Sequence, residues 1–479
     1  MLERREFYIN GKWVAPHKPS DFMVINPSTE KQLAVISLGG IEDTNAAVAA
    51  AKAALPNWMS SSVDSRLSLI KNLIDIYKRR AEEIAQVTSL EMGAPIDMAR
   101  SEQVPAGAWH LKNFLRAAEN FEFDRGLGKH APNDRIIYEA VGVAALITPW
   151  NWPLNQISLK FGAAAVAGCT MILKPSEQSP LNAMLFAECV DEAGFPPGVF
   201  NLVNGDGAGV GTQLSRHKDI DVVSFTGSTR AGKEISRNAA EGLKRLHLEL
   251  GGKGANLIFN DADEFAIERG VLHMMNNSGQ SCNAPSRMMV EANLYGLAVS
   301  LAKNIADEVE VDLAGYEGNH IGPVINETQW QKIQDLIQAG IDEGARLVAG
   351  GLGRPEGLTE GFFVRPTIFA DVTNDMTIAQ EEIFGPVLTI MKFEDEEEAI
   401  RLANDTEYGL TNYVQTRDAA RANRLARKLR SGMVEMNGKS RGAGSPFGGM
   451  KHSGNAREGG IWGIEDFLEV KAVSGWTVS

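Results

Sequence analysis

Cysteine is scarce in this sequence of 479 residues, which contains only Cys169, Cys189 and Cys282. Three scattered cysteines are too few for a disulfide framework or a cysteine-based metal site, and we expect no bound metal. Positive charge is also in short supply, because 47 Lys and Arg stand against 61 Asp and Glu, a formal net charge of −14. Nucleic-acid grooves and anionic membrane surfaces require clustered Lys and Arg. We therefore expect neither nucleic acid nor a membrane as a partner.

Long apolar runs are absent too. The longest, from Phe161 to Leu173, is shorter than the roughly 20 residues that a membrane-spanning helix needs. The first residues are charged and lack the apolar segment of a secretory signal, so we expect a cytoplasmic protein. At about 150 residues per domain, the length allows roughly two to four domains.

From residue 140 onward, short apolar runs alternate with helix-like segments. The runs predicted as strands are Val141–Ile147, Met171–Leu173, Val199–Val203, Val222–Phe225 and Leu246–Leu250. Helices are predicted between several of them, at Leu181–Ala193 and Arg230–Glu241. This alternation is typical of a parallel sheet covered by helices, which binds its ligand at the carboxyl ends of the strands. The turn residues that follow these strands therefore predict one shared crevice.

The rest of the chain predicts a two-domain α/β protein with a hairpin. After Gly251 we expect helices at 261–275, 293–309, 326–343, 395–404 and 417–430, and strands at 287–291, 363–369, 386–393 and 410–415. The first third is helical in character, with a helix that Asp64 caps and that runs on to Ile84. Two extended runs joined by a turn at 119–140 predict a projecting hairpin. We assign residues 1–118 and 141–251 to a Rossmann-like dinucleotide-binding domain and residues 252–465 to a catalytic domain.

A glycine-rich turn follows one predicted strand. Gly227-Ser-Thr-Arg-Ala-Gly-Lys-Glu234 nearly matches the spacing of a nucleotide-triphosphate P-loop, but Glu234 stands where Ser or Thr must bind Mg²⁺. What remains is a helix N-terminus whose backbone N–H groups suit a diphosphate, or a plain strand–helix turn. A second glycine cluster at 205–211 does not fit the dinucleotide-binding pattern Gly-x-Gly-x-x-Gly, so by itself it is weak evidence for a binding site.

Lys174-Pro-Ser-Glu177 lies just after another predicted strand. An acidic residue there can accept hydrogen bonds from a ribose and would repel a 2′-phosphate, and Lys174 can reach the same sugar. A Glu that complements the dipole in the first turn of a helix explains the pattern equally well.

Three residues elsewhere have the types that aldehyde chemistry needs. Cys282 lies in a polar, glycine-bearing loop whose small neighbours favour access and a stabilised thiolate, whereas Cys169 and Cys189 are predicted as packing residues. Glu249 ends an apolar strand, where desolvation raises the pKa of a carboxylate and suits a general base, although a salt-bridged strand residue is as consistent. Asn151 offers an amide of the kind found in oxyanion holes or, taken singly, a turn residue. His273 is interpreted as a packing residue rather than a base.

Taken in order, these motifs strongly resemble those of the aldehyde dehydrogenase superfamily, from Tyr8 to Lys471. They are Pro149-Trp-Asn151, Lys174-Pro-Ser-Glu177, Phe225-Thr-Gly-Ser-Thr229, Leu248-Glu-Leu-Gly-Gly-Lys253, Gly279-Gln-Ser-Cys282, Glu381-Glu-Ile-Phe-Gly-Pro386 and Pro446-Phe-Gly-Gly-Met-Lys-His-Ser-Gly454. The resemblance implies that Cys282 is the nucleophile, Glu249 the general base and Asn151 the oxyanion donor. It further implies a proton relay through Lys160 and Glu458.

The same resemblance implies NAD as cofactor and a set of residues that bind it. Lys174 and Glu177 match the ligands of the adenosine ribose. Gly227 and Ser228 match the positions that bind the diphosphate, and Glu382 and Phe384 match those that bind the nicotinamide half. Positions of the adenosine pocket or of backbone contacts match Ile147, Thr148, Trp150, Gly207 and Gly211. Glu177 implies NAD rather than NADP.

The implied activity is oxidation of an aldehyde to the acid through a thiohemiacetal and a thioester, within class EC 1.2.1.- and more narrowly 1.2.1.3. Relatives that transfer the acyl group to coenzyme A typically lack the base at Glu249, so hydrolysis is favoured. Residues 119–140 and 466–479 resemble oligomerisation elements, which implies a homodimer or homotetramer. Trp152 and the loop 437–445 are expected to line the substrate tunnel, but the aldehyde itself stays open. A catalytically silent binding protein on this scaffold is the alternative, while Glu234 disfavours an ATP-dependent enzyme.

Overall fold

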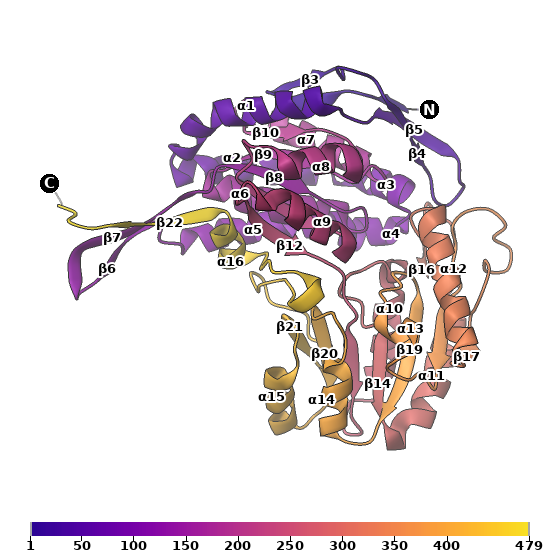
Figure 1. Cartoon of the computed structure of the whole chain (residues 1–479). Coiled ribbons are helices and arrows are strands. Elements are labelled where there is room, and N and C mark those ends of the chain that lie inside the picture. The colour runs from indigo at the N-terminus through magenta and orange to yellow at the C-terminus, as the bar shows by residue number, and fades with distance from the viewer. Residues whose placement is uncertain (1, 478–479) are drawn as a thin grey trace.

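Two seven-stranded sheets organise the chain in a computed structural model that describes residues 2–477 (Figure 1). The first sheet lies in the upper lobe of Figure 1 and the second in the lower lobe, with a narrow arm leaving the upper lobe at one side. Helices cover both sheets, so the α/β class predicted from the sequence is confirmed.

The first sheet has a parallel core with a short antiparallel edge. Its order is β12 (Arg245–Glu249), β11 (Val222–Thr226), β8 (Val143–Ile147), β9 (Thr170–Lys174), β10 (Phe200–Leu202), β2 (Phe7–Ile9) and β3 (Lys12–Val14). The five strands from β12 to β10 pair in parallel, and all five coincide with predicted apolar runs. The antiparallel pair β2 and β3 was not predicted, because neither three-residue strand has the apolar residues on both flanks that lengthen the run at β10.

Nine α-helices from the first half of the described chain pack in this lobe. They are α1 (Ile41–Met59), α2 (Val63–Arg79), α3 (Ala81–Met92), α4 (Ile96–Met98), α5 (Val104–Glu119), α6 (Pro153–Ala167), α7 (Pro180–Glu192), α8 (Thr212–Arg216) and α9 (Thr229–Ala240). Helix α16 (Gly460–Asp466), which follows the second lobe in the sequence, packs against two of them, α5 and α6. The Ala-rich run of the sequence is the buried helix α6 followed by β9. Cys169 and Cys189 are buried free thiols, as predicted for packing residues.

The helix predicted from Asp64 to Ile84 is wrong in its limits. Its N-cap is Ser62, whose hydroxyl accepts a hydrogen bond from Ser65 N at 3.2 Å, and Asp64 lies in the first turn. The chain leaves helical geometry at Arg80, so Ile84 belongs to the separate helix α3. No Pro or Gly marks this break, which explains why the periodicity runs across it.

The second sheet is parallel except at one edge. Its order is β17 (Arg346–Ala349), β18 (Thr367–Ala370), β19 (Val387–Phe393), β14 (Arg287–Glu291), β13 (Ala255–Ile258), β20 (Thr411–Gln415) and β21 (Met433–Met436). The predicted strands at 287–291, 386–393 and 410–415 are confirmed. The one at 363–369 begins only at Thr367, because Phe363 and Val364 are buried in the core without joining the sheet. Strands β13, β17 and β21, four residues each, were not predicted.

Helices of the second lobe match the predicted segments apart from their ends, except the short α13, which was not predicted. They are α10 (Ala266–Met275), α11 (Tyr295–Glu308), α12 (Glu327–Asp342), α13 (Thr377–Gln380), α14 (Glu396–Asn404) and α15 (Ala419–Lys428). Helix α10 starts later than the predicted residue 261. The first sheet ends at residue 249 and the second begins at 255, on either side of the division that we predict at residue 251.

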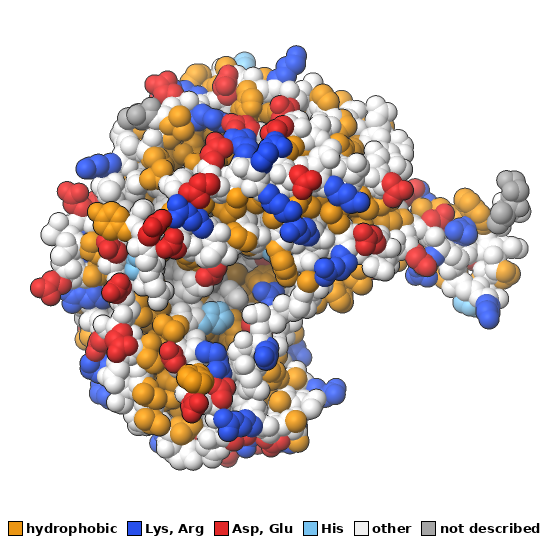
Figure 2. Space-filling view, turned by 180° about the vertical axis from the view of Figure 1, so that it is seen from behind, with side chains coloured by type: hydrophobic (Ala, Val, Ile, Leu, Met, Phe, Trp, Pro, Cys, Tyr) orange, Lys and Arg blue, Asp and Glu red, His pale blue; other side chains and the backbone are white. Residues whose placement is uncertain are grey.

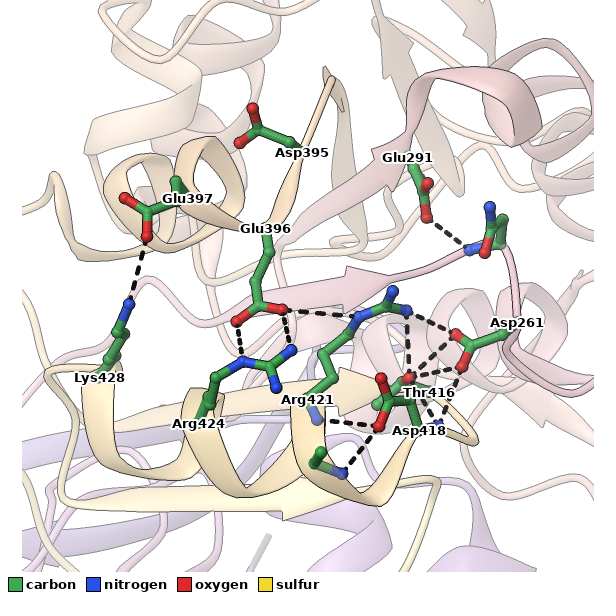
Figure 3. Close-up of polar contacts among 12 residues, drawn as sticks. Asp261, Glu291, Asp395, Glu396, Glu397, Thr416, Asp418, Arg421, Arg424 and Lys428 are labelled. Atoms are coloured by element: carbon green, nitrogen blue, oxygen red, sulfur yellow. Dashed lines mark hydrogen bonds and ion pairs between the residues drawn. The ribbon is translucent and has the colours of Figure 1, made fainter.

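Asp261 is instead the centre of a polar network that fastens α15 (Figure 3). Its carboxylate accepts hydrogen bonds from Thr416 Oγ1 at 2.9 Å, from Asp418 N at 3.0 Å and from Arg421 Nη1 at 2.9 Å. The Arg421 guanidinium lies 4.4 Å from the ring centroid of Phe259. Glu396 of α14 binds Arg424 through both carboxylate oxygens, at 2.8 and 2.6 Å. Asp261 and Glu396 therefore both bind arginines of the same helix, α15.

The predicted hairpin at 119–140 is confirmed as β6 (Asp124–Gly128) and β7 (Ala131–Ala140), and β22 (Leu468–Val473) pairs antiparallel with β7. Figure 1 shows these strands projecting from the first lobe as the arm. Two minor sheets join β1 (Leu2–Arg4), β5 (Gln32–Ser37) and β4 (Asp21–Ile25), and β15 (Glu310–Val311) with β16 (His320–Ile321). Within residues 2–477, no helix has the length and apolar character to cross a membrane.

Candidate active site

A cavity of about 640 Å³ lies where the two lobes meet. Helices α5 and α6 form one wall, and His273 of α10, Glu435 and the loop from Ser440 to Phe447 form the other. Cys282 is one of the lining residues, whereas Cys169 and Cys189 are not. Figure 2 shows the hollow between the lobes from behind. Trp152 and the loop at 440–445 line the cavity, as we expected.

Cys282 lies in a tightly packed loop and is half-buried. Asn277 and Ser278, just before it, adopt left-handed backbone angles with φ of 52° and 55°. A Cβ at Gly252 would lie 2.2 Å from the Cys282 carbonyl oxygen, so only glycine lets the two segments approach. Burial and the carboxylates of Glu249 and Glu382 raise the pKa of the Cys282 thiol. We expected small neighbours to stabilise the thiolate, but burial and then the two carboxylates shift the pKa in the opposite direction.

Glu249 ends β12 with 1% of its surface exposed. Neither carboxylate oxygen has a hydrogen-bond partner among the described residues. Burial, followed by the negative charge of Glu458, raises the pKa of Glu249 well above its usual range. The desolvated carboxylate predicted at this strand end is confirmed, and the salt-bridged alternative is wrong. A Cβ at Gly448 would lie 2.6 Å from Glu249 Oε1, so that glycine makes room for the carboxylate.

Lys160 and Glu458 form a buried ion pair beside Glu249. Lys160 Nζ of α6 lies 2.5 Å from Glu458 Oε1 and donates a hydrogen bond to Ser224 Oγ at 3.0 Å. Glu458 lines the cavity, and its Oε2 is unpartnered among residues 2–477. Both charges act on the pKa of Glu249, which places the three groups within electrostatic reach of one another.

Asn151 is held beside the Cys282 loop. Its side-chain Nδ2 donates to Gln280 O at 2.8 Å, while its backbone oxygen accepts from Asn277 Nδ2 at 3.0 Å and from Gln103 Nε2 at 3.1 Å. An amide nitrogen has two hydrogens, and the bond to Gln280 uses one of them. These contacts fix the second N–H near the loop that carries Cys282.

The carboxyl ends of β8 and β9 meet, and they bring Ile147, Thr148, Lys174 and Glu177 together. Thr148 N donates to Lys174 O at 3.1 Å, and the Thr148 hydroxyl is buried without a partner in the described chain. Lys174 Nζ donates to Pro175 O at 2.9 Å and lies 3.4 Å from Glu177 Oε2. Burial lowers the pKa of Lys174, whereas Glu177 keeps 26% of its side chain exposed.

The two glycine clusters border the same edge. Ser228 caps α9 through a hydrogen bond to its Oγ from Ala231 N at 3.3 Å, directly after Gly227. Gly207 and Gly211 bound one π-helical turn: the space above Gly207 is open, and a Cβ at Gly211 would lie 4.0 Å from Lys174 Cδ. Glu234 is exposed on α9.

Glu382 and Phe384 come from the second lobe. Glu382 Oε1 accepts a hydrogen bond from Gly252 N at 2.8 Å, and burial raises the pKa of Glu382. Phe384 has the left-handed φ of 59°, with Gln329 Nε2 donating to its carbonyl at 2.9 Å. Its ring packs edge-to-face on Trp150 at 5.4 Å between centroids. Left-handed backbone at a non-glycine residue persists only where its surroundings hold it.

Several cavity residues were not predicted. His273, interpreted as a packing residue, lies on the cavity wall and packs edge-to-face on Tyr413 at 5.1 Å. His110 Nε2 of α5 donates to Asn155 Oδ1 at 2.5 Å, and Trp109 beside it is 43% exposed. The adjacent aromatic and imidazole side chains of Trp109 and His110 on α5 are the sequence signal that could have marked this wall.

Comparison with known proteins gives the same result as the geometry. The model of the aldehyde dehydrogenase family matches residues 13–473. The chain belongs to the aldehyde dehydrogenase family. The resemblance drawn from the sequence motifs is therefore confirmed, and oxidation of an aldehyde is the reaction class of this fold.

Individual members of the family are similar over their full length. A 3-succinoylsemialdehyde-pyridine dehydrogenase of a Pseudomonas species is 49% identical over 478 residues, covering 99% of both chains. The crystal structure of an aldehyde dehydrogenase from Bartonella henselae is 56% identical with a TM-score of 0.99, over 99% of this chain and 100% of that one. Aldehyde dehydrogenase C from Pseudomonas syringae, a mutant crystallised with NAD⁺ and octanal, is 45% identical with a TM-score of 0.97, over 99% and 97%.

Proposed function

We propose that this aldehyde dehydrogenase uses NAD⁺ and hydrolyses a thioester formed on Cys282. The observation that carries the proposal is the pairing of Cys282, which opens into the cavity between the lobes, with Glu249, a buried carboxylate whose oxygens have no partner in the described chain. A thiol next to a desolvated base is the arrangement that acyl-enzyme chemistry needs.

The edge formed by β8, β9 and β11 fits a dinucleotide. The Thr148 hydroxyl has no partner among the described residues, and the space above Gly207 is open. Glu177, beside Lys174, is partly exposed. These groups are therefore available to bind a ligand. Lys174 and Glu177 would hold the adenosine ribose, with Ile147, Thr148, Trp150, Gly207 and Gly211 around it. Gly227 and Ser228 at the start of α9 would hold the diphosphate. Glu382 and Phe384 would hold the nicotinamide half.

The relatives support NAD⁺ as the cofactor. The Pseudomonas syringae enzyme was crystallised with NAD⁺, as was a Bacillus cereus aldehyde dehydrogenase that is 38% identical with a TM-score of 0.94. When bound, NAD⁺ supplies the oxidising power by accepting a hydride. The carboxylate of Glu177 favours a free 2′-hydroxyl over a 2′-phosphate, because the two negative charges repel.

The first step is addition of Cys282 to the aldehyde. Its sulfur bonds to the carbonyl carbon, and the thiol proton ends on the former carbonyl oxygen to give a thiohemiacetal. While that oxygen carries negative charge, Asn151 Nδ2 and the Cys282 backbone N–H are the donors that stabilise it. Loss of a hydride from carbon and a proton from oxygen leaves the thioester.

Hydrolysis then uses Glu249. The carboxylate takes a proton from water as the water oxygen bonds to the thioester carbon, and the carbon–sulfur bond breaks to return Cys282 and release the acid. Glu458 and Lys160, which act on the pKa of Glu249, supply the route by which this proton leaves.

The substrate range and the assembly are narrower proposals. The relatives' names refer to different aldehydes, including octanal and a pyridine-bearing semialdehyde, and we assign this enzyme to the general class EC 1.2.1.3. We also propose that the arm joins copies of the chain into a homodimer or homotetramer.

Incubation with NAD⁺ and a panel of aliphatic, aromatic and amino-aldehydes tests the proposed function. We expect NADH and the corresponding acid in equal amounts, and loss of both in Cys282→Ser. NADH from no aldehyde, or a Cys282→Ser variant that turns over normally, would reject it. Binding of NAD⁺ without turnover of any aldehyde would support the silent scaffold instead.

A further inference from the structure

The loop at 440–445 carries a charge into the substrate cavity. Arg441 is the only Lys or Arg among the described residues that line it, and its guanidinium stacks on Phe447 at 4.6 Å from the ring centroid. This cation lies close enough to the reaction centre to act on the pKa values of both Cys282 and His110. By itself, an arginine in this position would attract an aldehyde with a carboxylate tail.

Glu435 of β21 balances that charge. Arg441 Nε donates to Glu435 Oε1 at 2.9 Å, and Nη1 lies 3.3 Å from Met433 Sδ. The pair is well shielded, with 31% of the Arg441 side chain and 13% of the Glu435 side chain exposed. Arg441 Nη2 makes no hydrogen bond to a described residue, so its N–H groups are available to a molecule bound in the cavity that Arg441 lines. A carboxylate bound there would share the cation with Glu435, and like charges so close repel.

No other group on the wall restores a positive charge. Burial and Arg441 lower the pKa of His110 to about 4, and burial lowers the pKa of His273, so both are neutral at pH 7. Lys160 is committed to Glu458, and Glu102 adds a negative charge at the exposed rim. Trp109, Trp152, Phe114 and Phe447 supply apolar surface between these charges.

We propose that Glu435 is a specificity-determining residue that, by neutralising Arg441, makes the cavity select uncharged aldehydes with a neutral hydrogen-bond acceptor on their tail and exclude those with a carboxylate. This inference rests on the proposed aldehyde oxidation at Cys282. It assigns Arg441 Nη2 as the donor to the tail and Glu435 as the group that turns anions away.

Two isosteric probes test the inference in the wild-type enzyme with NAD⁺. 4-Formylbenzamide and 4-carboxybenzaldehyde have the same shape, but only the second is an anion. We expect kcat/KM to be about tenfold or more higher for the amide, because the carboxylate of the second probe would repel the Glu435 carboxylate in a shielded site. Equal values, or preference for the carboxylate, would overturn the inference while leaving aldehyde oxidation intact. Absence of NADH with both probes and with the whole aldehyde panel would reject the proposed function itself.

The variant Glu435→Gln removes the negative charge of this residue while nearly keeping its size, so it tests the charge separately from the shape of the cavity. We expect the amide-to-carboxylate ratio of kcat/KM to fall by about tenfold, because Arg441 then offers an unshared positive charge to the anion. In the double variant Glu435→Gln/Arg441→Gln, we expect kcat/KM for the carboxylate probe to lose the increase that Glu435→Gln alone produces. Glu192→Gln, which frees Arg79 on the outer surface at the end of α7, is the matched control and should keep the wild-type ratio. An unchanged ratio in Glu435→Gln, or the same change in the Glu192→Gln control, would overturn the assignment.

Discussion

At the scale of single residues, the site is defined by carboxylates that the fold keeps out of water. Glu249 has no hydrogen-bond partner in the described chain, and Glu382 has one backbone N–H at 2.8 Å. Glu249 is buried and Glu382 is partly buried, and loss of solvent raises the pKa of each. Their charges raise the pKa of Cys282 in turn, so the state of the nucleophile depends on groups from both lobes.

Replacement of Glu249 by Gln tests its role as the base of hydrolysis. We expect kcat to fall by about 10²–10⁴, the range of a lost general base, and the acyl group to remain on Cys282. Intact-mass measurement after mixing with aldehyde and NAD⁺ should show the added acyl mass. Steady-state kinetics equal to the wild type would contradict this role.

The pH dependence of hydrolysis follows from the same residue. Because the pKa of Glu249 is raised, its basic form is lost already as the pH falls through that raised value, above the range of an ordinary carboxyl. We therefore expect the hydrolysis rate to decline on the acid side in the wild type and to be flat there in Glu249→Gln. Single-turnover measurements across pH would show the difference.

At the scale of elements, α15 is held by charges more than by apolar surface. Leu425 is its one fully buried side chain among the described residues, whereas Asp261, Glu396 and Asp418 bind its N-terminal half (Figure 3). A helix with so little buried apolar surface depends on its cap and on its ion pairs.

The variant Asp261→Asn should destabilise the second lobe by about 1–3 kcal/mol, because a carboxylate that accepts several hydrogen bonds becomes a neutral amide. Urea unfolding followed by circular dichroism would show a lower midpoint. Glu397→Gln is the control, since Glu397 contacts only exposed Lys428 and is itself 86% exposed, and its midpoint should stay near the wild type. Equal midpoints for Asp261→Asn and the wild type would show that the network does not stabilise the helix.

Elements that are buried on both faces were the ones that the sequence predicted well. Strands β8, β9 and β11 are buried at every residue, so their apolar runs are continuous and visible. Strands of three or four residues, such as β2 or β13, leave no such run. The strand-end motifs around Asn151 and Glu249 were predictable because their neighbours in sequence are also their neighbours in space. Arg441 lies in the loop 437–445 that we expected to line the tunnel, whereas His110 and Glu435 were not predicted, because only folding brings their segments to the cavity.

At the scale of the whole molecule, the arm leaves strand edges outside the packed lobes. In the order β22–β7–β6, both β22 and β6 have one side without a partner among the described residues. Val470 on β22 is 62% exposed, and Leu127 on β6 is 40% exposed. Unpaired strand edges with apolar side chains favour pairing with another chain.

The variant Val470→Arg should shift the enzyme from the proposed dimer or tetramer to a smaller species, because a charged side chain opposes burial of this strand between copies. Light scattering coupled to size-exclusion chromatography measures the mass directly. Leu243→Lys alters an apolar side chain that is 92% exposed away from the arm, and it should leave the mass unchanged. A monomeric wild type, or a Val470→Arg variant of wild-type mass, would contradict the proposed role of the arm.

The pairing of β22 with β7 also sets an order on biosynthesis. The ribosome makes β7 long before β22, so a growing chain carries β7 with one open edge until β22 has been made. Glu458 lies just before β22 and reaches Lys160 only in the same late stage. A chain that stops before Glu458 would lack the proposed relay residue and would also keep the edge of β7 unpaired, which favours aggregation.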